Sequence, residues 1–279
     1  MDTLTSPPPN KPRGPAFPLP WLVVVLAVTA CVAFLIVTPG GLLFKADMVG
    51  YAVCHRITSH SFTIAGRQLP LCARCSGTFF GALIGIFGQA VVLRRRRAAE
   101  FPPPFVVVIL AGFILLWAAD GLNSYVTLFP NGPYLYEPQN WLRLTTGALN
   151  GLTMSTLVYP VFNFTLWRRP ASERAIRNLR DLGVLLLLEA GMVGLVLARW
   201  SFLLYPLALL SALGVLTLLT SVNSMLVLII VRRENVVDTW REGVVPLLAG
   251  FTVSLIQIGA IDVVRYVLTG TLEGIPPLQ

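Results

Sequence analysis

Long runs of apolar residues alternate with short polar segments along almost the whole chain. Each run reaches the roughly 17 to 25 residues that a helix needs to cross a bilayer about 30 Å thick. A helix is also the structure that satisfies its own backbone hydrogen bonds in lipid. The pattern therefore predicts about seven transmembrane helices, at residues 20–38, 76–93, 103–120, 142–166, 182–199, 202–231 and 243–261.

Composition agrees with this pattern. The chain has 279 residues, of which 55% are hydrophobic and 12% charged, so it is far more apolar than a soluble domain requires. We expect an all-α, polytopic integral membrane bundle that occupies residues 20–279. Residues 1–19 are rich in proline and polar groups and are expected to form a disordered cytoplasmic tail. The first apolar run lacks a convincing cleavage site after it, so it is interpreted as a span rather than a secretory signal.

The distribution of Lys and Arg predicts the orientation, because cytoplasmic loops retain positive charge during insertion. One alternating set of loops, which includes residues 94–97 and 168–180, holds 14 of the 21 basic residues. We therefore expect a cell (inner) membrane protein with a cytoplasmic N-terminus and residues 45–75 on the extracytoplasmic face. Insertion and contact with the lipid bilayer account for the net charge of +8, and no nucleic acid partner is expected.

The segment CHRITSHSFTIAGRQLPLCARC, residues 54–75, contains three of the four cysteines and both histidines. A Cys-x-x-Cys pair forms a tight turn that directs two sulfurs at one tetrahedral ion, and two further ligands complete the site. Zinc is the expected metal. The predicted ligands are Cys54, Cys72, Cys75 and either His55 or His60.

Two other interpretations of this segment stay open. Cys72 and Cys75 could cycle between dithiol and disulfide with Cys54 as partner, as in membrane thiol oxidoreductases that use a quinone. Alternatively, two of the cysteines could form a structural disulfide, since the extracytoplasmic compartment is usually oxidising. Cys31 lies within the first apolar run and is interpreted as a small apolar filler.

Polar residues on other segments are expected at the same membrane face. The predicted topology places Asp120, Asn140 and Arg143 beside the cysteine segment. Asp120 could accept hydrogen bonds from Arg143 or Arg74, or could orient a metal-bound histidine. An ordinary salt bridge that joins two helices is the plainer alternative.

Three further features concern the helices themselves. Glu189 lies about halfway along its predicted span, where it either relays protons or stays neutral against a neighbouring helix. Asp262 and Arg265 have the spacing of an intrahelical pair. Small residues repeat every fourth position at Gly77, Gly81 and Gly85 and again at Gly147 and Gly151, which predicts close packing of these two helices.

The motifs CHRITSHSF, PLCARCSG, DG at 120–121 and NWLRLTTG at 140–147 resemble the bacterial membrane proteins grouped as domain of unknown function 2085, over about residues 50–150. The resemblance points to the residues that match the family pattern, namely Cys54, His55, Cys72, Arg74, Cys75, Gly77, Asp120, Gly121, Asn140, Arg143, Thr146 and Gly147. His60 stands where that pattern has arginine, which favours His55 as the histidine ligand. The resemblance implies no activity.

The leading functional hypothesis is a metal-stabilised membrane protein that acts on a lipid or small anionic solute, with the external arginines as anion contacts. A thiol-disulfide oxidoreductase that uses Cys72 and Cys75 with Cys54 is the first alternative. A proton-coupled transporter with Glu189 as the coupling group is the second. The sequence leaves open whether the chain is an enzyme and whether it forms a homo-oligomer.

Overall fold

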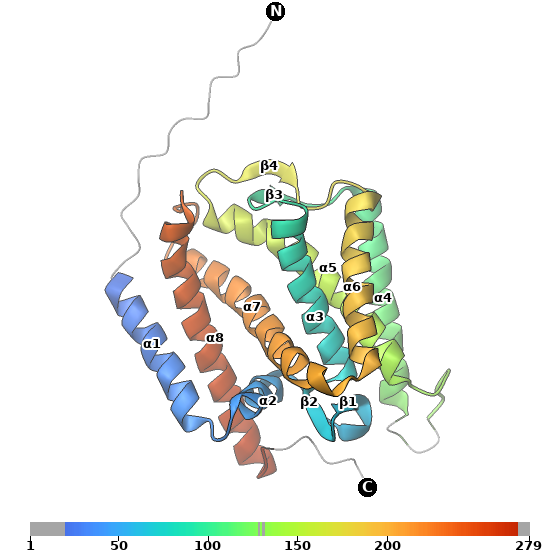
Figure 1. The fold of residues 1–279 in the computed structure, drawn as a ribbon. Coiled ribbons are helices and arrows are strands. Elements are labelled where there is room, and N and C mark those ends of the chain that lie inside the picture. The colour runs from blue at the N-terminus through green and yellow to red at the C-terminus, as the bar shows by residue number, and fades with distance from the viewer. Residues whose placement is uncertain (1–19, 128, 130–131, 273–279) are drawn as a thin grey trace, which may run out of the picture.

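A computed structural model describes residues 20–127, 129 and 132–272 of the chain. The described residues form a bundle of long helices, which confirms the all-α fold class (Figure 1). The predicted disordered tail at residues 1–19 lies outside the described residues.

The helices follow one another along the chain, and two short sheets lie in the segments between them. The helices are α1 (Pro20–Val37), α2 (Leu42–Val53), α3 (Ala73–Phe87), α4 (Pro104–Val126), α5 (Asn140–Leu166), α6 (Leu179–Ala198), α7 (Leu204–Ile230) and α8 (Trp240–Thr269). A π-helical turn, Gly88–Val92, extends α3, and 3₁₀ turns lie at Thr58–His60 and Ser201–Leu203. The antiparallel sheet pairs β1 (Ser61–Ile64) with β2 (Arg67–Cys72), and the parallel sheet pairs β3 (Ala98–Glu100) with β4 (Ala171–Arg174).

Six helical segments of the described chain are long and apolar enough to span a membrane, one fewer than the predicted seven. The difference is the run at 142–166, which forms α5 but is more polar than the other spans. Its polar residues include Asn150, Thr153, Ser155 and Asn163, all buried. A central helix can carry such residues because neighbouring helices, and not lipid, surround them.

The segment predicted as an external loop begins with a further helix, α2. At 12 residues α2 is too short to cross a bilayer. It packs against α7, α8 and the β1–β2 hairpin at one end of the bundle (Figure 1). Lys45 and Asp47 interrupt its apolar pattern, which explains why hydropathy did not reveal it.

The close packing predicted between two glycine-bearing helices is confirmed for α3 and α5. A Cβ added at Gly77 would clash with the backbone carbonyl of Leu144, and one at Gly147 would clash with that of Arg74. The two backbones therefore touch along this face. The same contact positions the first turn of α3, which carries Arg74 and Cys75, against the start of α5.

The bundle has two chemically different ends (Figure 1). The β3–β4 sheet lies at one end with the arginine-rich segments, where Arg95 is buried and pairs with Asp181 at 2.7 Å. The β1–β2 hairpin and α2 lie at the opposite end with the cysteines. The two sets of loops distinguished by their basic residues thus lie at different ends, and the orientation of those ends in the membrane stays a prediction.

Candidate metal centre

The β1–β2 hairpin brings Cys54 and Cys72 together from positions 18 residues apart. Ala65 and Gly66 form its two-residue turn with φ of +49° and +75°, the left-handed conformation that tight hairpins require. Gly66 adopts such a φ without steric cost. The returning strand ends at Cys72, which caps α3, while Cys54 follows α2 directly.

Backbone amides point at the sulfurs of this hairpin. The amide N–H groups of Cys72 and Arg56 donate to Cys54 Sγ at 3.2 Å and 3.4 Å, and the Cys75 N–H donates to Cys72 Sγ at 3.5 Å. Donors aimed at sulfur stabilise the thiolate, which is the form that binds metals. The hairpin therefore prepares these sulfurs to carry negative charge.

The ligand atoms of Cys54, His55 and Cys72 lie within 4.8 Å of one another. Tetrahedral ligands of one zinc ion at about 2.3 Å would be separated by about 3.8 Å, so small side-chain shifts bring these atoms to bonding distance. Cys75 lies outside this group of three but interacts with both Cys54 and Cys72 through its thiol. All four cysteines of the chain are free thiols in this structure.

The thiols of Cys54 and Cys72 differ in pKa. A hydrogen bond from the Cys72 thiol, followed by one from Cys75, holds the pKa of Cys54 well below its ordinary value. The same contact with Cys54 raises the pKa of Cys72 to about 12. These contacts therefore favour the thiolate at Cys54, with the Cys72 thiol as a hydrogen-bond donor to it.

The two histidines contact each other edge to face, with ring centroids 5.7 Å apart. Burial lowers the pKa of His55, and burial together with the Arg143 charge lowers the pKa of His60 to about 4. Both rings are therefore neutral at pH 7, the state in which imidazole can bind a metal. His55 belongs to the group of three and His60 does not, although Nδ1 of His55 accepts a hydrogen bond from the Ile57 amide at 3.0 Å.

Charged residues that sequence reasoning did not assign to the site hold the segment in place. Asp47 of α2 pairs with Arg56 at 3.0 Å and with Arg67 at 2.6 Å, so the helix is tied to the segment that leads into the hairpin and to β2. Arg265 of α8 donates to the carbonyl oxygens of Tyr51 and Cys54. The expected pairing of Arg265 with Asp262 is therefore wrong, because these carbonyls take its guanidinium.

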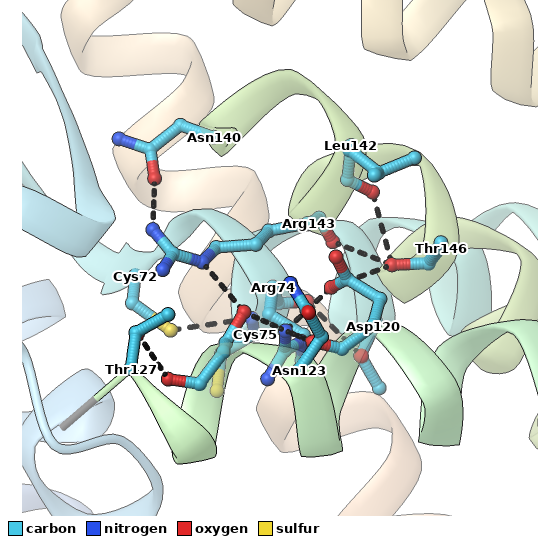
Figure 2. Close-up of polar contacts among 12 residues, drawn as sticks. Cys72, Arg74, Cys75, Asp120, Asn123, Thr127, Asn140, Leu142, Arg143 and Thr146 are labelled. Atoms are coloured by element: carbon cyan, nitrogen blue, oxygen red, sulfur yellow. Dashed lines mark hydrogen bonds and ion pairs between the residues drawn. The ribbon is translucent and has the colours of Figure 1, made fainter. Parts of the chain in front are cut away.

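The aspartate predicted beside the site pairs with the arginine of the Cys-x-x-Cys turn (Figure 2). Arg74 donates to Asp120 Oδ2 at 2.5 Å, and the hydroxyls of Tyr136 and Thr146 donate to the same carboxylate at 2.9 Å and 3.3 Å. Asp120 thus anchors the turn to α4 and α5. Of the predicted alternatives, the geometry matches the ion pair with Arg74 and not a contact with histidine.

Arg143 is buried close to this pair but has no carboxylate partner among the described residues. Its Nε donates to Ser124 Oγ at 3.3 Å, and its Nη1 donates to Asn140 Oδ1 at 2.8 Å (Figure 2). Asn140 in turn donates to the carbonyl of Ser59, which precedes His60. The guanidinium groups of Arg74 and Arg143 lie beside a single carboxylate, that of Asp120, so this region carries a net positive charge. That charge favours the thiolate form of the nearby cysteines.

Glu189 lies apart from this centre. It is buried on α6, and neither carboxylate oxygen has a hydrogen-bond partner in the described part of the chain. Its Oε1 faces Gly81 of α3, which lies six residues, or about 9 Å of helix, beyond Cys75. Glu189 therefore belongs to the middle of the bundle rather than to the cysteine end.

Comparisons with known proteins agree with the motifs. Residues 54–157 match the model of the family described as predicted membrane protein (DUF2085). The uncharacterized protein MJ1492 of Methanocaldococcus jannaschii is 26% identical over 117 residues, which cover 42% of this chain and 68% of that protein. No solved structure matches the chain at a significant level. Over residues 54–157 the chain is thus similar to the DUF2085 family of predicted membrane proteins, and the resemblance carried by its cysteine, Asp-Gly and Asn-x-x-Arg motifs is confirmed.

Proposed function

We propose that this chain is a multi-pass membrane protein that holds one structural zinc ion at the extracytoplasmic end of its bundle. The ligands are Cys54, Cys72, Cys75 and His55. The observation that carries the proposal is the convergence of Cys54, His55 and Cys72 within 4.8 Å, with Cys75 adjoining them. Four protein ligands leave no position for water, which is typical of structural rather than catalytic zinc.

The electrostatics of the centre support this proposal. Zinc with three thiolates and a neutral imidazole carries a net negative charge. Arg143, which is buried without a carboxylate partner in the described part of the chain, and the Arg74–Asp120 pair supply a surrounding of the opposite sign. The metal would join the end of α2, the hairpin and the start of α3, and its binding energy would then stabilise that end of the bundle.

Metal content tests the proposal directly. We expect the full chain, purified in detergent without chelator, to contain close to one zinc ion per molecule by inductively coupled plasma mass spectrometry. Cys72→Ser and Cys75→Ser should lose the ion. Cys31→Ser is the matched control, because Cys31 lies on α1 away from the centre and should leave zinc content unchanged.

Two results would contradict the zinc site. The first is a monodisperse wild-type protein without metal, and the second is equal metal in the wild type and in Cys72→Ser. Circular dichroism of each variant separates loss of zinc from loss of the helical fold. A folded variant without zinc supports the site, whereas a folded variant with zinc excludes that cysteine as a ligand.

A thiol-disulfide oxidoreductase is the second candidate, favoured by three free sulfurs in mutual contact. In that reaction two thiols lose two electrons and two protons and form a disulfide, while a membrane quinone takes both and becomes a hydroquinone. Thiol titration distinguishes the two candidates. Metal-free protein that reversibly loses two titratable thiols on exposure to a quinone would favour this second function.

The remaining expectations from the sequence carry less support. The arginines expected to contact a lipid or small anionic solute make hydrogen bonds to groups of the protein itself. Proton-coupled transport rests on the carboxylate of Glu189 alone, which has no hydrogen-bond partner among the residues that the structure describes. A proton-coupled flux in reconstituted vesicles that Glu189→Gln leaves intact would remove that carboxylate as the coupling group.

A further inference from the structure

An apolar groove lies between α1 and α8 at the cysteine end of the bundle. Its volume is about 510 Å³, which is within the range of small-molecule sites. Phe34 of α1, Thr38 directly after that helix, Met48 of α2, and Leu255 and Gly259 of α8 are among its walls. Most side chains of α1 are otherwise exposed, so this helix covers the groove without being locked into the core.

One carboxylate opens onto this groove. Asp262 is among the lining residues, and its Oδ1, which is itself enclosed by the protein, has no hydrogen-bond partner among the described residues. Arg265, one helical turn further on, directs its Nη1 to the carbonyls of Tyr51 and Cys54 and forms no ion pair with Asp262. A carboxylate in an apolar membrane cavity is costly unless a partner satisfies it, so it marks a functional site.

The dimensions of the groove limit what it can hold. Its α8 wall runs from Leu255 to Tyr266, which is about 16 Å at 1.5 Å per residue. Asp262 lies toward the outer part of that wall, seven residues before the end of the helix at Thr269. A molecule with its head at Asp262 would therefore extend its tail inward, along Leu255 and α1, toward the middle of the bundle.

We propose that this groove binds a single-chain amphiphile whose head donates a hydrogen bond to Asp262. The tail lies between α1 and α8, and the head is a hydroxyl or an ammonium group, since either donates to a carboxylate. An anionic head is disfavoured there, because it has no hydrogen to donate to Asp262 and would lie beside a carboxylate. The proposal is independent of the zinc site, because none of the proposed metal ligands lines the groove.

Photoreactive C16 probes test the site in the full chain, reconstituted in phosphatidylcholine nanodiscs. The probes carry a diazirine in the tail and a hydroxyl, ammonium or carboxylate head, and peptide mass spectrometry maps the labelled residues. We expect the alcohol and the amine to label the parts of α1 and α8 that line the groove. The carboxylate should label them about tenfold less, the factor that corresponds to one charge-assisted hydrogen bond.

Two variants separate the groove from general lipid contact. Gly259→Leu should abolish groove labelling, because a Cβ at Gly259 meets no atom within 4 Å and the side chain can fill the cavity without displacing the backbone. Gly194→Leu on α6 is the matched control, since Gly194 is equally open but lies outside the groove, and it should change nothing. A third variant, Asp262→Asn, should abolish the preference of the groove for the amine over the carboxylate probe, and an unchanged preference would contradict the role of Asp262.

The proposal fails if all three probes label the groove equally, or if Gly259→Leu labels like the wild type. It also fails if intermolecular cross-links show a second copy of the chain seated between α1 and α8. Zinc content measured on the same samples keeps the two proposals apart. If Gly259→Leu contains as much zinc as the wild type but is not labelled by the probes, the result supports ligand binding in the groove. This conclusion does not depend on whether zinc is the native metal.

Discussion

The Cys-x-x-Cys turn is held by a residue between its two cysteines. Arg74 pairs with Asp120, whose side chain is 2% exposed, at 2.5 Å. Breaking a buried ion pair costs more than the pair contributes, because the remaining charge keeps its desolvation penalty. The geometry of both sulfurs therefore depends on a carboxylate 46 residues further along the chain.

Asp120→Asn tests this dependence with little change of volume. We expect the variant to lose about 3 kcal/mol of unfolding free energy, an estimate between the costs of exposed and buried pairs because Arg74 is partly exposed. Its zinc affinity should fall about 10- to 100-fold, as for other residues that orient metal ligands. Denaturant titration in detergent and competition with a zinc chelator measure the two effects.

The control is an exposed ion pair at the other end of the bundle. Arg177 contacts Glu173 at 2.5 Å, with the arginine side chain 56% exposed. Arg177→Gln should change stability by less than about 1 kcal/mol and leave zinc affinity unaltered. An effect of Asp120→Asn no larger than that of Arg177→Gln would show that Asp120 does not support the cysteines.

Sequence reasoning located some residues of the centre and missed others for a physical reason. The convergence of Cys54 and Cys72 was predictable because both belong to one short segment, whereas Cys75 as a ligand stays a prediction. Asp47 and Arg265 were missed. Arg265 acts on a backbone carbonyl 211 residues away, and a contact of that kind leaves no pattern of residue types.

At the scale of elements, the α3–α5 contact connects the membrane interior to the candidate centre. The two helices approach until backbone touches backbone, and the first turn of α3 carries Cys75. This contact was predictable because small residues recur at every fourth position. The short helix α2 was not, because periodicity is a weak signal over 12 residues that include a lysine and an aspartate.

Substitution at this contact gives a prediction for the elements. Gly147→Ala should destabilise the bundle by about 1 to 3 kcal/mol, because its Cβ would meet the backbone carbonyl of Arg74 and force α3 and α5 apart. Gly112→Ala on α4 is the control: nothing lies within 4 Å of a Cβ there, and alanine is the better helix former. Thermal unfolding followed by circular dichroism compares the two, and equal midpoints would contradict the close contact.

At the scale of the whole molecule, the two ends of the bundle carry different residues. The rule that positively charged loops stay in the cytoplasm therefore predicts which end faces inward. The cysteine hairpin and the segment between α4 and α5 lie at one end, while β4 and the start of α6 lie at the other (Figure 1). If positive charge is retained in the cytoplasm, the arginine-rich end faces inward and the proposed zinc site faces the oxidising side. A bound metal would then protect thiols that oxidation otherwise threatens.

Accessibility to a membrane-impermeant maleimide decides this orientation. Leu135→Cys places a thiol at a side chain that is 88% exposed, and it should react in intact cells. Arg177→Cys, also at an exposed position, should react only after the cells are permeabilised. The unmodified protein supplies the background, because Cys54 and Cys72 are buried.

The reverse pattern of labelling would place the cysteine hairpin in the reducing cytoplasm. That result would contradict the extracytoplasmic placement of the proposed zinc site.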